Sequence, residues 1–201
     1  SANLAALVEA GVRSFKIEGR YKDMGYVKNI TAHYRTLLDE IIEEREAQGR
    51  PLSRSSSGRT TFTFKPDPLQ NFNREFTDYF VNGRQMDIGT FDSPKHVGLP
   101  LGHIAKVAND HFDIDTGDEA KALHNGDALT WWDRQGELQG VPVNVAKPLS
   151  GRAWRVFPNA PIAQLKDLRR DLALSRNRDM AWERLLAAKS AERLIGVTLV
   201  F

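Results

Sequence analysis

The chain has 201 residues, of which 41% are hydrophobic, and its 28 Lys and Arg against 26 Asp and Glu leave a net charge of +2. This is the composition of an ordinary globular protein with room for one large domain or two small ones, and so small a charge does not by itself indicate a nucleic-acid partner. The sequence contains no Cys, which excludes disulfides, cysteine nucleophiles and cysteine-ligated zinc or iron–sulfur sites from this chain.

The first 48 residues have the pattern helix, strand, helix. Asn3 and Gly11 are suited to begin and end a short helix, and residues 12–17 read as a short buried strand. Asp23 is a suitable N-cap for a second helix, in which apolar residues recur at helical spacing to about residue 46. One strand cannot form a sheet, so we expect the rest of that sheet to lie outside this chain.

Residues 49–60 contain Gly, Pro and three consecutive serines, which is the composition of a linker. From residue 61 the period changes from helical to alternating, and turn residues recur about every ten positions to residue 160. This pattern predicts a small antiparallel β-barrel over residues 61–160.

Residues 161–201 are predicted to be a helical tail. Pro161 suits the first turn of a helix through residue 170, and Asn177 or Ser175 is a candidate cap for a second helix. Residues 194–201 then read as a strand that has no partner in the sequence. Because the chain starts in mid-pattern and ends inside this strand, we expect it to be a fragment of a longer protein.

Lys16, Glu18 and Arg20 form the candidate binding site. They alternate at the end of the predicted strand, so their side chains share one face. Two cations and a carboxylate at such a strand end can hold a carboxylate-bearing substrate or an RNA phosphate. The alternative is a salt bridge with a purely structural role.

Other polar groups give weaker signals. No pair of the five histidines has the spacing of a helical zinc site, and residues 113–119 resemble a calcium loop but lack its terminal Glu, so no metal site is predicted. The three serines at 55–57 have no associated His and Asp, which argues against a serine nucleophile. No metal ion or other cofactor is therefore expected in this chain.

Trp131 and Trp132 are adjacent on a predicted strand, so one of them faces outward, where it either stacks on an RNA base or packs against a neighbouring domain. Residues 50–74 carry five basic residues and one acidic residue. This is either an ordinary solvated face or part of a phosphate-facing surface.

Several blocks of the sequence resemble the U32 peptidase family, also called the collagenase-like proteases, and its long-form bacterial branch in particular. The blocks are Ser14-Phe15-Lys16-Ile17-Glu18-Gly19-Arg20, Tyr26-Val27, Tyr34-Arg35, Thr77-Asp78-Tyr79-Phe80, Gly98-Leu99-Pro100-Leu101-Gly102, Arg176-Asn177-Arg178-Asp179 and Ser190-Ala191-Glu192-Arg193.

The resemblance implies a TIM-like barrel in the N-terminal part of the family, and an iron–sulfur cluster held by cysteines in the full-length parent protein. It therefore implies an α+β chain: residues 1–48 as the last strand–helix unit of the TIM-like barrel, the linker, the small antiparallel β-barrel, and the helical tail with the start of a further domain.

Members of that branch include one that makes 5-hydroxycytidine in 23S ribosomal RNA, so the resemblance implies oxidative modification of RNA bases, with rRNA as a partner. The chain itself is then a substrate-positioning module, in contact with the remainder of the parent polypeptide. The alternative function is a collagenase-like peptidase, a hydrolase. No membrane span or signal peptide is visible, which favours the cytoplasm.

Overall fold

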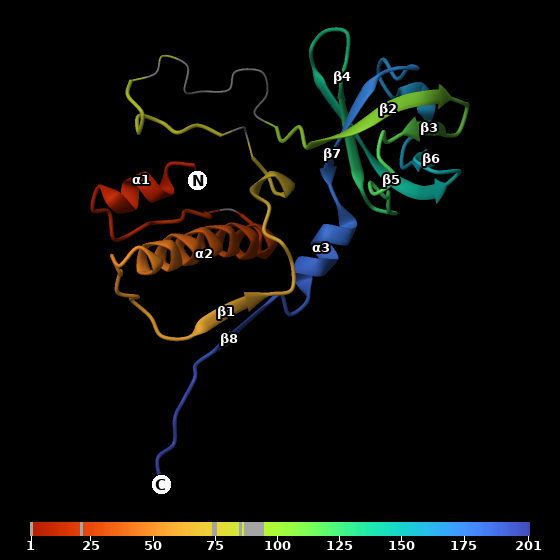
Figure 1. The fold of residues 1–201 in the computed structure, drawn as a ribbon. Coiled ribbons are helices and arrows are strands. Elements are labelled where there is room, and N and C mark those ends of the chain that lie inside the picture. Colours follow the sequence, from red (N-terminus) through yellow and green to blue (C-terminus); the bar gives the residue numbers. More distant parts are fainter. Residues whose placement is uncertain (1, 21, 74–75, 85, 87–94) are drawn as a thin grey trace. The chain divides into compact units, whose positions relative to one another are not determined.

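The computed structural model describes residues 2–20, 22–73, 76–84, 86 and 95–201. The chain divides into two compact units. The first unit comprises Ser1–Pro68, Asp78–Arg84 and Leu185–Phe201, and the second comprises Leu69–Thr77 and Gln85–Arg184. Figure 1 shows helices α1 and α2 with strands β1 and β8, and separately a barrel made by strands β2 to β7.

Helices α1 (Leu4–Glu9) and α2 (Met24–Ala47) belong to the first unit. As predicted, Asp23 caps α2, since its side chain accepts a hydrogen bond of 2.7 Å from the backbone N–H of Tyr26. Gly11 follows α1 in the left-handed region, with φ of 99°, as expected for a glycine that ends a helix. The side chain of Asn3 occupies the cap position of α1 but makes no capping hydrogen bond.

Residues 12–17 do not form the predicted strand. These residues lie in neither a helix nor a strand, and Ile17 is 42% exposed. A strand is defined by hydrogen bonds to a neighbouring strand, and none of the described strands of this chain pairs with this segment. An apolar sequence alone therefore does not produce the buried strand.

A two-stranded antiparallel sheet completes the first unit. Strand β1 (Arg59–Phe62) pairs with β8 (Ala191–Leu194), although about 130 residues separate them in the sequence. The prediction that β1 begins the barrel was therefore wrong. The predicted strand at residues 194–201 was also misplaced, because strand pairing ends at Leu194.

The second unit is a closed six-stranded antiparallel barrel, which confirms the predicted architecture. Its strands follow the order β2-β3-β6-β5-β4-β7 around the barrel. Their bounds are β2 (Leu99–Val107), β3 (Phe112–Asp115), β4 (Ala128–Trp132), β5 (Leu138–Pro148), β6 (Ala153–Pro158) and β7 (Ala173–Arg178). Closure leaves no unpaired edge.

The predicted barrel boundaries, 61–160, differ from the observed ones, 99–178. Residues 173–178, which were predicted to belong to a helical tail, form the strand that closes the barrel between β2 and β4. The predicted helix at 161–170 is reduced to the single turn η2 (Ile162–Gln164), and another single turn, η1 (Pro68–Gln70), precedes the barrel. Ser175 and Asn177 lie in β7, so neither caps helix α3 (Met180–Ala187).

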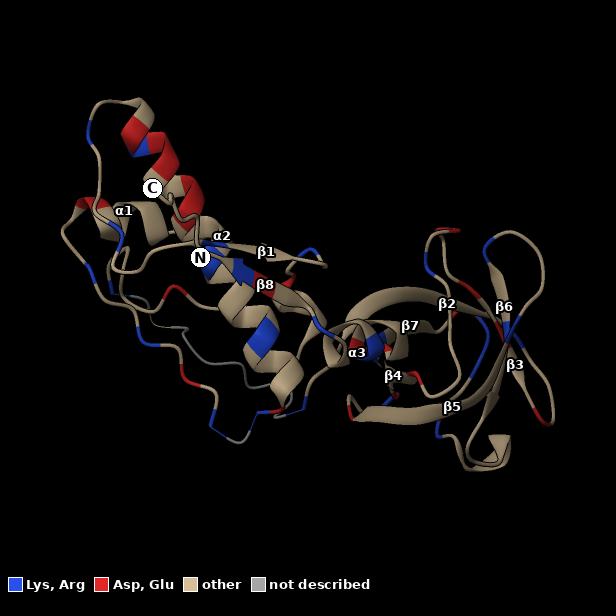
Figure 2. Cartoon of the chain, turned by 90° about the horizontal axis from the view of Figure 1, so that it is seen from below, with Lys and Arg blue, Asp and Glu red and all other residues tan. Residues whose placement is uncertain are grey.

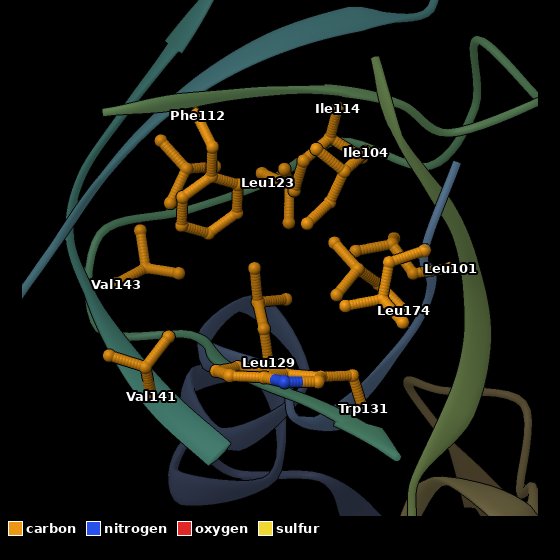
Figure 3. Close-up of a cluster of buried hydrophobic side chains, with 12 residues drawn as sticks. Leu101, Ile104, Phe112, Ile114, Leu123, Leu129, Trp131, Val141, Val143 and Leu174 are labelled. Atoms are coloured by element: carbon orange, nitrogen blue, oxygen red, sulfur yellow. The ribbon is translucent and has the colours of Figure 1, made fainter. Parts of the chain in front are cut away.

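Twelve buried apolar side chains fill the barrel, as Figure 3 shows. They are Leu101, Ile104, Phe112, Ile114, Leu123, Leu129, Trp131, Val141, Val143, Val156, Leu172 and Leu174. Trp131 points into this core and donates a hydrogen bond of 2.9 Å from its indole Nε1 to the carbonyl oxygen of Lys166. Its neighbour Trp132 remains partly exposed on the outer face, as strand alternation requires.

Two glycines at the ends of the block 98–102 allow the strands of the barrel to approach closely. A side chain at Gly98, where φ is 92°, would overlap the backbone of Arg176, and one at Gly102 would overlap the carbonyl oxygen of Asp115. The glycines of this block are thus explained by backbone packing.

No described helix of the chain is both long enough and apolar enough to span a membrane.

Candidate functional site

The predicted site residues Lys16, Glu18 and Arg20 lie in the first unit, just before α2. Lys16 Nζ is 2.8 Å from Glu18 Oε1, and both side chains are largely exposed, at 84% and 73%. Arg20 is exposed as well, and a Cβ at the intervening Gly19 would lie 3.4 Å from the side chain of Val27. The structure therefore brings Lys16 and Glu18 together on the surface, in a form that water screens strongly.

The basic segment that follows α2 folds back onto that helix. Figure 2 shows acidic residues gathered toward the C-terminal end of α2. Arg54 pairs with Asp39, and Arg59 Nη2 lies 3.0 Å from Glu43 Oε1. These arginines thus offset the negative charge of two carboxylates in the C-terminal half of α2. This favours the structural interpretation of the basic segment over a phosphate-facing surface.

A charged network closes one end of the barrel around Arg176. Its Nη1 lies 3.3 Å from Asp127 Oδ2, and its Nη2 lies 2.6 Å from Asp179 Oδ2. Asp127 is fully buried and also accepts hydrogen bonds from the backbone N–H groups of His124 and Met180, at 3.0 and 2.8 Å. Such a buried carboxylate needs these partners to offset its desolvation.

Asp179 links this network to α3. Its Oδ1 accepts hydrogen bonds from the backbone N–H groups of Ala181 and Trp182, at 3.0 and 3.2 Å. Asp179 is thus the N-cap that sequence reasoning had assigned to Asn177 or Ser175. The signal for this cap in the sequence was an Asp that directly follows the basic end of a strand.

Within the described residues, His124, Asp127 and Asp179 each place one potential metal-ligand atom within 4.8 Å of the others. Both carboxylates, however, already contact the guanidinium of Arg176. A guanidinium in this position supplies the charge that a cation would supply, so the cluster is best described as an ion-pair network. The cysteine-ligated iron–sulfur cluster that the family resemblance implies does not fit this chain, which contains no thiolate.

The two Asp residues of β3 are covered by arginines: Asp113 is buried and Asp115 is partly buried. Asp113 accepts two hydrogen bonds from Arg155, at 2.8 and 3.1 Å, and Asp115 pairs with Arg152 at 2.8 Å. The bond from Arg155 lowers the pKa of Asp113 below its usual value. Sequence reasoning missed the role of these arginines because they lie about 40 residues away.

Asp133 organises the turn between β4 and β5. Its carboxylate lies 2.5 Å from Lys166 Nζ and accepts hydrogen bonds from the backbone N–H groups of Gln135 and Glu137. The bond from Lys166, followed by the turn N–H groups, lowers the pKa of Asp133 from 3.8 to about 2. This carboxylate is therefore a structural anchor that stays ionised at neutral pH.

The other candidates from the sequence are His33 and the serines at 55–57, and their contacts indicate a structural role. His33 packs edge to face on Tyr34 in α2, and burial lowers its pKa below the usual value. The serines at 55–57 are exposed, and the carbonyl oxygen of Ser57 accepts a hydrogen bond of 3.1 Å from Arg193 Nε. Neither observation supports a nucleophile or a metal ligand.

Comparison with known proteins shows what this chain is similar to. A family model described as peptidase family U32 matches residues 1–90. The 23S rRNA 5-hydroxycytidine C2501 synthase of Escherichia coli (strain K12) is 49% identical over 199 residues, which are 99% of this chain. The chain spans 29% of the length of that synthase. Residues 1–90 are thus similar to peptidase family U32, and the similarity to the synthase runs through both units.

Proposed function

We propose that the protein that carries this chain hydroxylates a cytidine of ribosomal RNA. The observation that carries the proposal is the 49% identity to the E. coli synthase, which extends over 99% of the chain and includes the barrel as well as the region of the U32 model. A site of action in the cytoplasm follows from this proposal, because bacterial ribosomes are assembled there.

Within that protein, the chain contributes substrate positioning. The exposed cluster Lys16, Glu18 and Arg20 precedes α2 in the segment that we assign to the last strand–helix unit of a TIM-like barrel. Loops that follow barrel strands carry the active sites of such barrels. Any iron–sulfur cluster would be held by cysteines elsewhere in the protein, because this chain has none.

A collagenase-like peptidase is the second candidate, and only the family description favours it. Peptide hydrolysis needs an activated nucleophile or a metal-bound water. The carboxylates that come together in the described part of the chain contact arginines or lysines, as at Asp127, Asp113 and Asp133. They are arranged to stabilise the fold.

The test assays one preparation of the protein that carries this chain for both activities. Ribosomal RNA from cells that lack the modification is incubated with it, and nucleosides are analysed by mass spectrometry for 5-hydroxycytidine, while gelatin cleavage is followed in parallel. We expect hydroxylation without cleavage. Gelatin cleavage without hydroxylation would reverse the assignment.

A chimera gives an independent test of this segment. The chain replaces the matching residues of the E. coli synthase, and the chimera is expressed in an E. coli strain that lacks its own synthase. Restored 5-hydroxycytidine in 23S rRNA shows that the chain is functionally equivalent to the segment it replaces. A folded chimera that restores none would count against the proposal.

A further inference from the structure

A row of charged residues crosses the outer face of four barrel strands. Lys106 on β2 is the register partner of Asp113 on β3, Asp113 is the partner of Arg155 on β6, and Arg155 is the partner of Lys147 on β5. The alternating neighbours on β3 and β6 are buried in the core, so this row faces away from it. We call these four residues the outer row.

The outer row has three cations and one carboxylate. Arg155 holds Asp113 through two hydrogen bonds, and this pair leaves Lys106 and Lys147 as exposed positive charges on either side of it. Neighbouring strands are about 4.8 Å apart, so three strand spacings place the two lysine positions about 14 Å apart. The row is therefore a short cationic stripe across the barrel.

An aromatic ring lies beside this stripe. Phe157, two residues after Arg155 on β6, is partly exposed. Lys147 Nζ is 5.3 Å from the centroid of its ring, and the imidazole centroid of His111 is 5.4 Å away. His111 in turn contacts Asp110, with 2.6 Å between Nδ1 and Oδ1. Cations and an aromatic ring thus meet on one strand face.

We infer that the outer row and Phe157 form a binding surface for single-stranded RNA. Lysine and arginine contacts to phosphates supply sequence-independent affinity, and aromatic rings on strand faces stack on unpaired bases. The arrangement differs from an arginine–carboxylate pair that only stabilises strands, because two exposed lysines flank the pair. The inference rests on the proposed function and names the surface that holds the RNA next to the modified base.

The experiment measures RNA binding by the protein that carries this chain, using a fluorescent 12-nucleotide single-stranded RNA at several salt concentrations. The test variant is K106Q/K147Q. We expect it to bind about tenfold more weakly, and its salt slope to fall by about 1.4, since each single-strand phosphate contact contributes about 0.7. The control R134Q/K189Q removes the same charge from side chains that are 69% and 76% exposed outside the outer row, and should bind nearly as the wild type does.

A second variant is expected to bind RNA more tightly than the wild type. Damage to the fold would not produce that result. Asp113→Asn removes the only carboxylate of the outer row and leaves Arg155 available to a phosphate, so we expect tighter binding and a salt slope steeper by about 0.7. Thermal unfolding of each variant shows whether it is folded. Weakened binding in K106Q/K147Q together with tighter binding in Asp113→Asn supports the surface.

Three results would overturn the inference: no binding of single-stranded RNA by the wild type, equal binding by K106Q/K147Q and its control, or equally tight binding of an RNA duplex. Binding of a gelatin peptide that K106Q/K147Q abolishes would assign the surface to a peptide instead. The hydroxylation assay separates the two proposals. A wild type that forms no 5-hydroxycytidine contradicts the proposed function, whereas hydroxylation with unchanged RNA binding in the variant contradicts only the outer row.

Discussion

Arg176 Nη2 lies 2.6 Å from Asp179 Oδ2, and this ion pair joins the last strand of the barrel to the first turn of α3. The same guanidinium contacts the fully buried Asp127 and donates a hydrogen bond of 2.7 Å to the carbonyl oxygen of Ala122. One side chain thus contacts two carboxylates at this end of the barrel.

Arg176→Ala is expected to destabilise the protein strongly. It leaves Asp127 buried without its counter-charge, and removal of one partner of a buried ion pair costs about 3–5 kcal/mol. The control is Arg178→Ala, which removes a pair with Glu183 whose side chains are 53% and 45% exposed and should cost about 0.5 kcal/mol. Urea unfolding of both variants measures the difference, and equal stabilities would show that the network contributes little.

Gly102→Ala is expected to disturb the pairing of β2 with β3, because the new methyl group would overlap the carbonyl oxygen of Asp115. We expect a loss of about 3 kcal/mol, the upper range for single substitutions. Gly140→Ala is the matched control in β5, where a Cβ would meet its nearest atoms at an ordinary 3.4 Å. Unfolding curves in which Gly102→Ala is as stable as Gly140→Ala would contradict the close approach.

The contribution of Asp133 should depend on pH. Its pKa in the folded protein is lowered from 3.8 to about 2 by Lys166 and the turn N–H groups, so its stabilising effect is complete above pH 3.8 and is lost as the pH falls through 2. Melting temperatures of wild type and Asp133→Asn should therefore differ at pH 6 and converge between pH 4 and pH 2. A difference that stays constant over this range would show that the carboxylate charge is not responsible.

Arg20→Ala should abolish RNA modification in the protein that carries this chain while leaving the melting temperature nearly unchanged, because the side chain is exposed. Arg20→Lys should also be poor, since lysine keeps the charge but loses the planar fork that binds a carboxylate or phosphate through two hydrogen bonds. Lys22→Ala is the control and should retain more activity. Full hydroxylation by a stable Arg20→Ala protein would remove Arg20 from the site.

The sequence by itself determined features that depend on neighbouring residues. Asp23 caps α2 and Gly11 ends α1 because capping involves atoms only a few residues apart. The alternation of apolar residues likewise predicted the antiparallel barrel, and of the adjacent Trp131 and Trp132 only Trp131 is buried. Such alternation is set by the geometry of the strand itself.

Only the tertiary structure decided which distant segments pair. Residues 173–178 close the barrel and β1 pairs with β8, because strand hydrogen bonds join segments without regard to their distance in sequence. The same holds for the charged groups: Arg155 meets Asp113, and Arg176 meets Asp127, across 42 and 49 residues. Conversely, the strand predicted at residues 12–17 is absent, because a strand requires a partner that no other described segment of this chain supplies.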